Sequence, residues 1–582
     1  MRSAAPNSAT LNTAALSFKP FATLKADTEM VRYLKPNPDW EEHEKPAIPG
    51  SASMPSHRPP IRLAYASVAV LVGITGGLGN ALVSVNLPTI QGQLGLTPSQ
   101  ASWLPASYVM VNVTTNLLVF KFRQQYGMRL FTEIGLGLYA LITLLHLVVG
   151  TLATTVLVRA ASGFAGAATS TLAMLYMLQA LPRAYVGKML VVGVGIAQLA
   201  TPLAWVLSPS LLESGEWHNL YRFEAGLALC SFAAVVVLKL PPGTHIKVFE
   251  KRDFLTFALL APGSAMLVGV LAQGYSQWWL DAQWLAWMLI GAVVLLSAAF
   301  YIEHHRESPL IQTRWLTTPG MLRFILGAFL IRFLTSEQSY GAVGLLRTLG
   351  MGPDQMQALF VVVLVGTVAG IAASALTFSP ATMIPQILVS ILLFGVAAFL
   401  DYGRTSLDRP EDFFTSQFLV AVGAGMFMGP LIMAGFMQAL QHGPNYIITF
   451  TVTLSMSQVM GGLAGSAALS TYQLHREHVY SAAIVAQLNP ADPMVAQRLR
   501  LQERIYQPQV SDPTLRGAQG MALLAQTARR EANVRAFNDV FAVNAIVALL
   551  FLFWLLWRTM LARRTKKLEE AAQSATPGGN RT

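Results

Sequence analysis

The stretch LAYASVAVLVGITGGLGNALVSV, residues 63–85, runs for 23 residues without a charged side chain. An α-helix rises about 1.5 Å per residue, so about 20 apolar residues cross the ~30 Å hydrocarbon core of a bilayer. The stretch therefore predicts a membrane-spanning helix. No apolar segment of signal-peptide type precedes it in residues 1–62, so we expect this helix itself to direct insertion.

The composition extends this conclusion to the whole chain. Of its 582 residues, 53% are hydrophobic and 12% are charged, whereas an ordinary soluble domain has about 25% charged residues. Such a chain can satisfy its apolar surface only if lipid replaces water around most of it. The net charge of +11 comes from basic residues spread over helix ends, so no nucleic-acid partner is expected. The single cysteine, Cys230, excludes an intrachain disulfide framework.

The same length rule predicts fourteen membrane-spanning helices in all. Because this number is even, both termini should lie on one side of the membrane. The predicted spans lie near residues 63–88, 101–122, 130–149, 152–178, 187–208, 220–240, 254–273, 283–302, 321–345, 355–377, 382–400, 414–438, 446–470 and 537–560.

Lysine and arginine in the short loops predict which side that is. They gather in the loops after the even-numbered spans, and loops of the other parity carry few, a bias that marks the cytoplasmic side. We therefore expect cytoplasmic termini and a multi-pass protein of the inner (cytoplasmic) membrane. The basic residues concerned are Lys121, Arg123, Arg129, Arg183, Lys188, Lys239, Lys247, Lys251, Arg252, Arg306, Arg314, Arg558, Arg563, Arg564, Lys566 and Lys567.

The spans group into two bundles of six with two additional helices between them. One long hydrophilic segment interrupts the second bundle, and its helix-forming stretches between prolines predict a small extracytoplasmic helical cap, either a docking surface for a partner or a folded lid. The predicted parts are a disordered, proline-rich cytoplasmic tail (1–62), an N-terminal bundle (63–240), a linker with two additional spans (241–320), a C-terminal bundle (321–560) containing the outer segment (472–535), and a cytoplasmic tail (561–582).

Several segments resemble one transporter family. LVSVNLPTIQGQLGLTPSQASWLPASYVM (82–110) is similar to the first two spans and intervening loop of the fourteen-span drug:proton antiporters of the major facilitator superfamily, the EmrB/QacA-like group. VRAASGFAGA (158–167) resembles the fourth-span motif, and GMFMGPLIMAG (425–435) and VMGGLAGSA (459–467) resemble the glycine-rich twelfth and thirteenth spans. The outer segment and RAFNDVFAV (535–543) resemble the same regions of EmrB-type members.

This resemblance implies the major facilitator fold and proton-driven efflux of small, largely apolar compounds. It implies no cofactor beyond a proton gradient. In EmrB-like systems a periplasmic adaptor (HlyD/EmrA-like) and an outer-membrane channel complete the export route. Motif positions that this chain keeps are Gly127, Arg129, Gly163, Gly195, Pro202, Gly461 and Gly462.

The chain also departs from the family pattern, as a divergent member would. The family usually has an aspartate in the first span where this chain has Gly79, and Gln124 replaces the aspartate expected after the second span. Ser162, Ala204 and Gln458 replace an expected glutamine, glycine and arginine. Loss of the first-span carboxylate leaves the identity of the proton carrier open.

Charged side chains within apolar helices usually face a cavity or a partner, so they form the candidate site. Arg159 either takes part in proton transfer or anion binding, or it hydrogen-bonds neighbouring carbonyls as a structural residue. Arg332 is expected near the midplane, and its spacing from Glu337 does not favour a pair. Glu337 is the most deeply embedded carboxylate, so we predict it to be protonatable; the alternative is a structural ion pair at the outer rim.

Other titratable residues have weaker claims. His146 could relay protons, although a lone histidine in an apolar helix is more often satisfied locally. Glu133, Glu224 and Asp539 lie near predicted span ends, where a snorkelling surface role is expected.

No enzymatic signature is present in the sequence. It has no Walker A sequence, no HExxH, no metal-ligand spacing of Cys and His and no nucleophile elbow, so we expect neither an enzyme nor a metal site. Glycine-rich runs inside predicted spans favour close helix packing rather than nucleotide binding.

The sequence thus predicts a secondary active transporter working by alternating access, most simply proton-coupled efflux of small hydrophobic or weakly acidic compounds. Arg159 and Arg332 make the interior positive, which favours anionic substrates. Two alternatives stay open: a solute importer of the same superfamily, and a transport-inactive membrane sensor or assembly protein.

Overall fold

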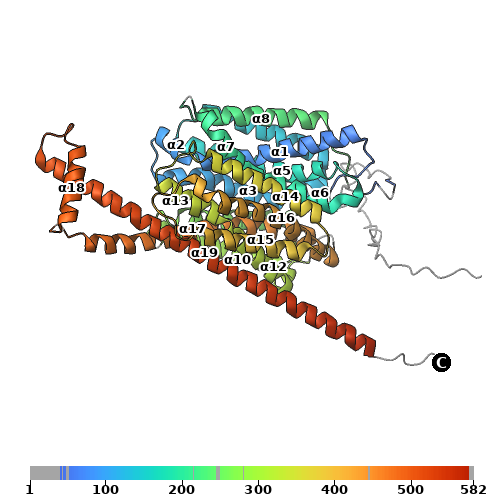
Figure 1. Ribbon diagram of the computed structural model, residues 1–582. Coiled ribbons are helices and arrows are strands. Elements are labelled where there is room, and N and C mark those ends of the chain that lie inside the picture. The colour runs from blue at the N-terminus through green and yellow to red at the C-terminus, as the bar shows by residue number, and fades with distance from the viewer. Residues whose placement is uncertain are drawn as a thin grey trace, which may run out of the picture.

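The structure is a computed structural model that describes residues 40–41, 44–46, 51–213, 215–243, 250–279, 281–307, 309–443, 446–489 and 491–575. Every regular element within these ranges is a helix. The helices run side by side in one bundle, and α18 lies beyond one end of it (Figure 1). The predicted all-helical architecture is confirmed.

Helices of the N-terminal half occupy the upper part of the view in Figure 1. They pack α1 against α5, α7 and α8, and α4 against α5 and α8. The elements are α1 (Pro59–Val85), α2 (Leu87–Gln93), α3 (Pro98–Tyr126), α4 (Met128–Leu145), α5 (Leu152–Met177), α6 (Val186–Gly195), α7 (Ala200–Leu212) and α8 (His218–Val237).

The C-terminal half lies below them in the same view. Its first crossing is interrupted, because α12 and α13 are joined by a π-helical turn (Glu337–Ala342). The elements are α9 (Lys251–Gln273) and α10 (Gln283–His304), which precede this half, and α11 (Thr313–Leu316), α12 (Pro319–Leu334), α13 (Val343–Thr348), α14 (Gln357–Thr377), α15 (Met383–Leu400), α16 (Phe414–His442), α17 (Tyr446–Gln487), α18 (Pro493–Ile505) and α19 (Pro513–Ala575).

Twelve helical stretches in the described part of the chain are long and apolar enough to cross a membrane. Two further helices, α3 with 29 residues and α5 with 26, have sufficient length but contain more polar side chains. They pack against each other, and Asn112 Nδ2 of α3 donates to Gly163 O of α5 at 3.1 Å. Their polar groups thus find partners in protein rather than lipid. The count of fourteen spans needs these two helices and stays a prediction.

The two ends of the bundle differ. In Figure 1, α2 and α18 lie at one end, whereas α1 begins and α19 ends at the other. The chain therefore starts and finishes its helical course on the same side, as an even number of crossings requires. We call the α2 and α18 end the outer end; that it faces away from the cytoplasm stays a prediction from the loop charges.

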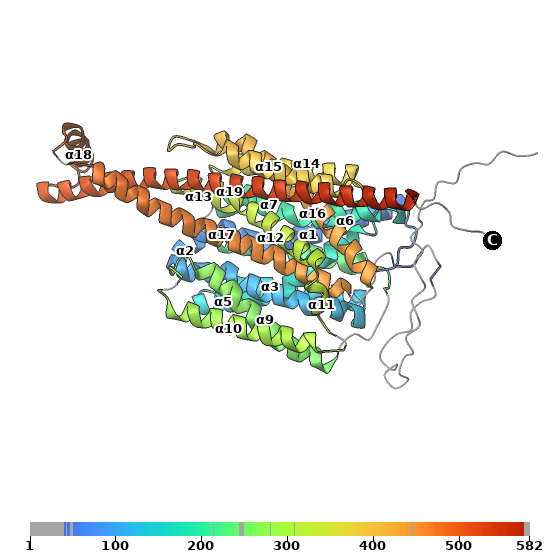
Figure 2. The same ribbon diagram turned by 90° about the horizontal axis from the view of Figure 1, so that it is seen from below.

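The predicted cap at 472–535 is instead an extension of two long helices. α17 continues to Gln487 and α19 begins at Pro513, and α18 joins them beyond the bundle (Figure 2). We call residues 472–535 the outer arm. Asp539, expected to snorkel at a span end, lies at its base and accepts from Arg476 Nε at 2.5 Å. This contact fixes α17 to α19 where they leave the bundle.

The predicted tails are shorter than expected. Residues 1–39, 42–43 and 47–50 of the N-terminal tail lie outside the described residues, but its last part is packed. Ser53 N donates to Pro242 O at 3.0 Å, and Gln179 Nε2 donates to Ser53 O at 3.0 Å. Residues 51–62 therefore belong to the folded domain, because these bonds tie them to the inner end of the N-terminal half. At the other terminus, α19 runs to Ala575, well into the predicted tail.

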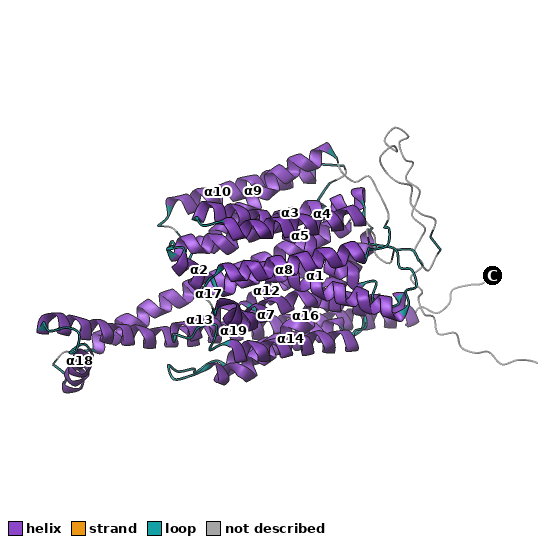
Figure 3. Cartoon of the chain, turned by 90° about the horizontal axis from the view of Figure 1, so that it is seen from above, coloured by secondary structure: helices purple, strands orange, loops and turns teal. Residues whose placement is uncertain are grey.

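The two additional helices, α9 and α10, lie together at one edge of the bundle beside α3 (Figure 3). A buried ion cluster attaches them there: Lys121 Nζ lies 2.5 Å from Asp253 Oδ2, and Arg306 lies 2.8 Å from Asp253 Oδ1 and 3.1 Å from Glu303 Oε1. Buried charges must be paired to be tolerated. The pairing therefore anchors this hairpin to the N-terminal half.

Candidate functional site: two buried polar clusters

Arg159 on α5 has no exposed surface. Its Nη1 donates to Gly79 O at 2.9 Å, its Nη2 to Asn80 Oδ1 at 2.7 Å and its Nε to Leu104 O at 3.4 Å. The Tyr108 ring centre lies 4.8 Å from the guanidinium carbon, a cation–π distance. A single guanidinium thus connects α5 to both α1 and α3.

Glu224 on α8 lies on the other side of the same stretch of α1. Only 1% of its surface is exposed, so the expected snorkelling role is wrong. Tyr139 on α4 donates its hydroxyl to Glu224 Oε1 at 2.8 Å, and the same hydroxyl lies 3.2 Å from Thr75 O. Glu224 Oε2 has no hydrogen-bond partner among the described residues. Five helices, α1, α3, α4, α5 and α8, therefore meet at one buried carboxyl group and one arginine.

His146 lies at the outer end of α4, immediately beside this cluster, and is fully buried. Its ring stacks on Tyr221 of α8 with centres 4.4 Å apart, and its Nε2 lies 3.5 Å from Ser162 Oγ. Its Nδ1 lies 3.2 Å from the carbonyl of Ile142. Both ring nitrogens thus have local partners, and the ring still lies between the outer end and the Arg159 cluster.

Glu337 lies at the start of the π-helical turn in the C-terminal half and is 1% exposed. Gln417 Nε2 donates to Glu337 Oε1 at 3.2 Å and to Asp401 Oδ2 at 3.0 Å. One amide nitrogen thus bonds to both carboxyl groups, which places Glu337 and Asp401 beside each other. Arg404 donates to Asp401 Oδ1 at 2.9 Å. π-Helical turns are frequent at functional sites.

Arg332 on α12 points away from this pair. Its side chain is exposed and makes no hydrogen bond or ion pair with any described residue. It passes two glycines of α17: a Cβ on Gly461 would meet Arg332 Cβ at 3.1 Å, and one on Gly462 would meet Arg332 Nε at 3.4 Å. A guanidinium without a partner among membrane-spanning helices faces a water-filled route more readily than lipid.

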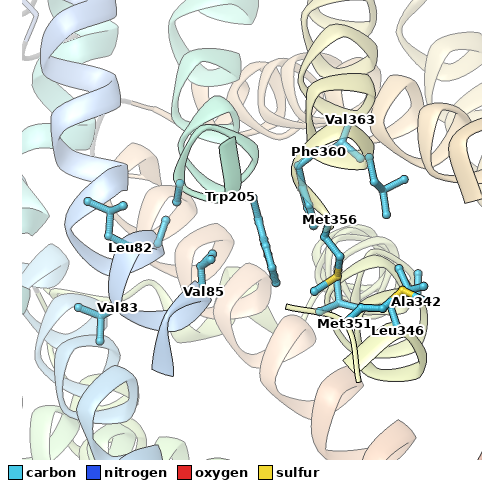
Figure 4. Close-up of a cluster of buried hydrophobic side chains, with 14 of the residues drawn as sticks. Leu82, Val83, Val85, Trp205, Ala342, Leu346, Met351, Met356, Phe360 and Val363 are labelled. Atoms are coloured by element: carbon cyan, nitrogen blue, oxygen red, sulfur yellow. The ribbon is translucent and has the colours of Figure 1, made fainter. Parts of the chain in front are cut away.

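At the outer end, both halves share one apolar core, part of which is drawn in Figure 4. Trp205 of α7 stacks on Phe360 of α14 with ring centres 4.5 Å apart and nearly parallel planes. Arg347 Nη2 donates to Val85 O of α1 at 2.8 Å, and Arg347 lies 5.3 Å from the Trp205 ring. The structure is thus closed between its halves at the outer end. We call this contact region the outer seal.

Three predicted motif positions lie where helices approach closely. A Cβ on Gly163 would lie 2.2 Å from Tyr108 O, so α3 and α5 could not cross with a larger residue. A Cβ on Gly195 would meet Ile371 at 2.8 Å, at a contact between the two halves. Pro202 is buried within α7. These positions serve packing, as small residues in membrane helices usually do.

Two further motif positions, Gly127 and Arg129, lie at the junction between α3 and α4. Gly127 has φ of 88°, a conformation that an L side chain rarely adopts, and it ends α3 and starts α4. Arg129 forms an exposed ion pair with Glu133 at 2.9 Å. Among the described residues, the side chain of Arg129 bonds to Glu133 and to neither buried cluster.

The structure brings two of the four predicted pathway residues together, Arg159 and His146, and directs Arg332 and Glu337 to different surroundings. The sequence interpretation missed Glu224, Asp401 and Gln417. Asp401 directly follows the apolar run of α15, so the sequence predicts an exposed loop residue at this position. Glu224 was discounted because it lies near a span end, although a helix packed on all sides buries its ends as well.

Comparison with known proteins shows which class of protein this chain belongs to. The model of the Major Facilitator Superfamily matches residues 69–483. The chain is 23% identical over 505 residues to the fatty acid resistance protein FarB of Neisseria gonorrhoeae, covering 82% of this chain and 92% of FarB. It is 23% identical over 249 residues to the uncharacterized transporter YebQ of Escherichia coli, which spans 42% of this chain and about half, 52%, of YebQ. The crystal structure of the human organic anion transporter MFSD10 has a TM-score of 0.51 at 13% identity, covering 84% of this chain and all of MFSD10.

The fold and the matches define a multi-pass membrane transporter and not an enzyme. The chain belongs to the Major Facilitator Superfamily, as a divergent member with multidrug-resistance relatives. Its place is the inner membrane, as predicted from sequence.

Proposed function

We infer that this protein exports small amphipathic organic acids across the cytoplasmic membrane in exchange for protons. The observation that carries the proposal is the carboxyl pair of Glu337 and Asp401, buried together on one amide inside a membrane transporter. Two adjacent carboxyl groups hold a shared proton rather than two charges. Such a pair can take up a proton when exposed to one side of the membrane and release it on the other. No cofactor is needed beyond the proton gradient.

The substrate class follows from Arg332. Its guanidinium has no partner among the described residues and lies between helices of the bundle, so a negatively charged group can pair with it. The surrounding helices are apolar, which suits a hydrophobic tail attached to that group. The similarity to a fatty acid resistance protein over most of both chains supports the same class.

The outer arm is the part most suited to a partner. Its helices project beyond the bundle and expose large apolar side chains, with Met494 71% and Ile505 62% exposed. We propose a periplasmic adaptor (HlyD/EmrA-like) at the arm, with an outer-membrane channel beyond it. Copurification of the full chain with a coexpressed adaptor, compared with a variant in which Met494 and Ile505 are both serine, tests this; equal capture by both proteins contradicts it.

The transport proposal is tested in bacterial cells that lack their own export pumps. Cells producing the chain should survive more laurate than control cells, should gain nothing against uncharged methyl laurate, and should lose the protection when a protonophore collapses the gradient. Glu337→Gln should abolish the protection, because the amide cannot take up a proton. Glu411→Gln, an exposed carboxyl at the same end, should not.

Two outcomes would overturn this function. Increased laurate uptake by cells producing the chain would favour the importer. Unchanged survival and unchanged accumulation over a wide compound panel would favour the sensor or assembly protein.

A further inference from the structure

The space beside Gly79 in α1 is occupied. A Cβ on Gly79 would lie 2.4 Å from Glu224 Oε1 and 2.3 Å from the Tyr139 hydroxyl. A carboxyl group from α8 thus fills the volume that a side chain on α1 would need. A residue larger than glycine at 79 therefore does not fit beside the observed Glu224 side chain.

The positively charged group nearest this space is Arg159. Arg159 Nη1 bonds to Gly79 O at 2.9 Å, so the guanidinium and the Glu224 carboxyl group approach residue 79 from two sides. The three nitrogens of Arg159 donate to Gly79, Asn80 and Leu104. The charge therefore stays near Glu224 and does not form a closed ion pair with it, which would hold the carboxylate permanently ionised.

The Glu224 carboxyl group has one free oxygen. Oε1 accepts from Tyr139, whereas Oε2 is buried without a partner among the described residues. A carboxylate buried with a single donor is poorly stabilised, and a proton on the free oxygen removes the charge. The titratable groups facing it are Tyr108 on α3, Tyr139 on α4 and Arg159 on α5, with Tyr221 on its own helix.

Tyr139 connects this proton to the helix that forms the outer seal. Its single hydroxyl hydrogen has two acceptors within reach, Glu224 Oε1 at 2.8 Å and Thr75 O at 3.2 Å. When Glu224 is ionised, the hydrogen is held by the carboxylate. When Glu224 is protonated, the hydrogen is free to bond to Thr75 on α1, whose outer end carries Leu82 and Val85 of the seal.

A cavity lies at the outer end of the N-terminal half, near this cluster. Its volume is about 450 Å³, and it is lined by Leu147, Trp217 and Arg222 among others. His146 and Tyr221, stacked on each other, lie directly behind it, because His146 adjoins Leu147 and the Tyr221 ring contacts Trp217 edge-on at 5.4 Å.

From this geometry we propose that Glu224 is a proton-binding carboxyl group of the N-terminal half. Its carboxylate takes one proton from water at the outer end to form the neutral acid, and returns that proton to water on the cytoplasmic side after the halves rearrange. No other bond forms or breaks. The proposal rests on the proposed function for its role in transport, but proton binding itself does not.

Infrared difference spectra between acidic and alkaline pH, recorded on the purified full chain in lipid nanodiscs, test proton binding without any substrate. The wild-type spectrum should contain a buried protonated-carboxyl band that Glu224→Gln removes. Glu133→Gln, at a partly exposed carboxyl on α4 that is paired with Arg129, should leave the band unchanged. A spectrum of Glu224→Gln identical to wild type overturns the proposal. Because this measurement needs no transport, its failure is distinct from failure of the export function.

Moving the carboxyl group to residue 79 tests whether this buried position binds the proton. Gly79→Asp alone should destroy laurate resistance through steric overlap with Glu224 and with the Tyr139 hydroxyl. Gly79→Asp combined with Glu224→Ala and Tyr139→Phe, which removes both overlapping groups, should restore a buried carboxyl band. Glu224→Gln should be produced and should elute like wild type yet give no resistance. Resistance of Glu224→Gln equal to wild type, or a triple variant that elutes normally and has no carboxyl band, overturns the proposal.

Discussion

Each half of the bundle buries carboxyl groups toward the outer end, but the surroundings that compensate their negative charge differ. In the N-terminal half one carboxyl group, Glu224, lies near an arginine across the backbone of α1. In the C-terminal half two carboxyl groups, Glu337 and Asp401, share an amide, and Arg404 reaches only one of them. The N-terminal cluster depends on a nearby cation, and the C-terminal cluster on a shared proton. The halves should therefore differ in how mutation and pH affect them.

The largest effect is expected from Arg159→Ala. The variant removes three hydrogen bonds that the guanidinium makes between helices, and hydrogen bonds to a charged group contribute about 1.5–3 kcal/mol each. Thermal unfolding of the purified protein should occur at a clearly lower temperature, and laurate resistance should vanish. Arg159→Lys keeps the charge without the three-way geometry and should recover only part of the stability. Wild-type stability in Arg159→Ala would show that the N-terminal cluster does not depend on its cation.

The next largest effect lies where the halves meet. Trp205→Ala empties the outer seal opposite Phe360, at a cost of about 3 kcal/mol to the closed state. In a Cys230→Ser background with Leu346→Cys, a membrane-impermeant maleimide should label the seal faster when Trp205 is alanine. Trp557→Ala, at an exposed tryptophan of α19, should not change labelling. Equal labelling rates would mean that the stacked rings do not close the outer end.

The membrane fold was predictable because lipid imposes one strong constraint: long apolar stretches must be helices that cross it. Arg159 and Glu337 were predictable for the same reason, since charges inside such stretches are rare. The environment of Gly79 was not predictable from sequence. Glu224 is far from it along the chain, and only the packing of α1 against α8 shows that one residue fills the space the other leaves.

The outer arm shows the opposite error. Its helix-forming composition was recognised, and α18 and the start of α19 are helical as expected. Its connection to the bundle was missed, because hydropathy places a span boundary wherever charge appears, whereas a helix continues through water if its backbone bonds and side-chain pairs permit. The pair of Arg476 and Asp539 provides such support.

A smaller effect, on the order of 1 kcal/mol, is expected from Asp401→Asn in the C-terminal cluster. Burial raises the pKa of Asp401, although hydrogen bonds from Ser416 and Arg404 oppose the shift. The folded state then holds its proton more tightly than the unfolded chain, so the stabilisation is complete below the ordinary aspartate pKa of about 3.9 and is lost as pH rises through the higher folded value.

The melting temperature of the wild type should therefore fall more steeply between acidic and neutral pH than that of Asp401→Asn, because the asparagine side chain does not titrate. Asp408→Asn, at a neighbouring and more exposed aspartate, should follow the wild-type curve. Parallel curves for Asp401→Asn and wild type would mean that the C-terminal pair does not hold its proton in this way.

The smallest effect sets the scale for the comparison. Arg129 and Glu133 form an ion pair at 2.9 Å, but unlike the buried Arg159 side chain, the Arg129 side chain is 63% exposed. Exposed pairs contribute about 0.5 kcal/mol or less, because water and salt screen them and both side chains lose freedom. Arg129→Ala should therefore unfold within about 1 °C of wild type and retain laurate resistance. If this variant lost as much stability as Arg159→Ala, burial would not be what makes the N-terminal arginine important, and the contrast between the two halves would have to be sought in helix packing instead.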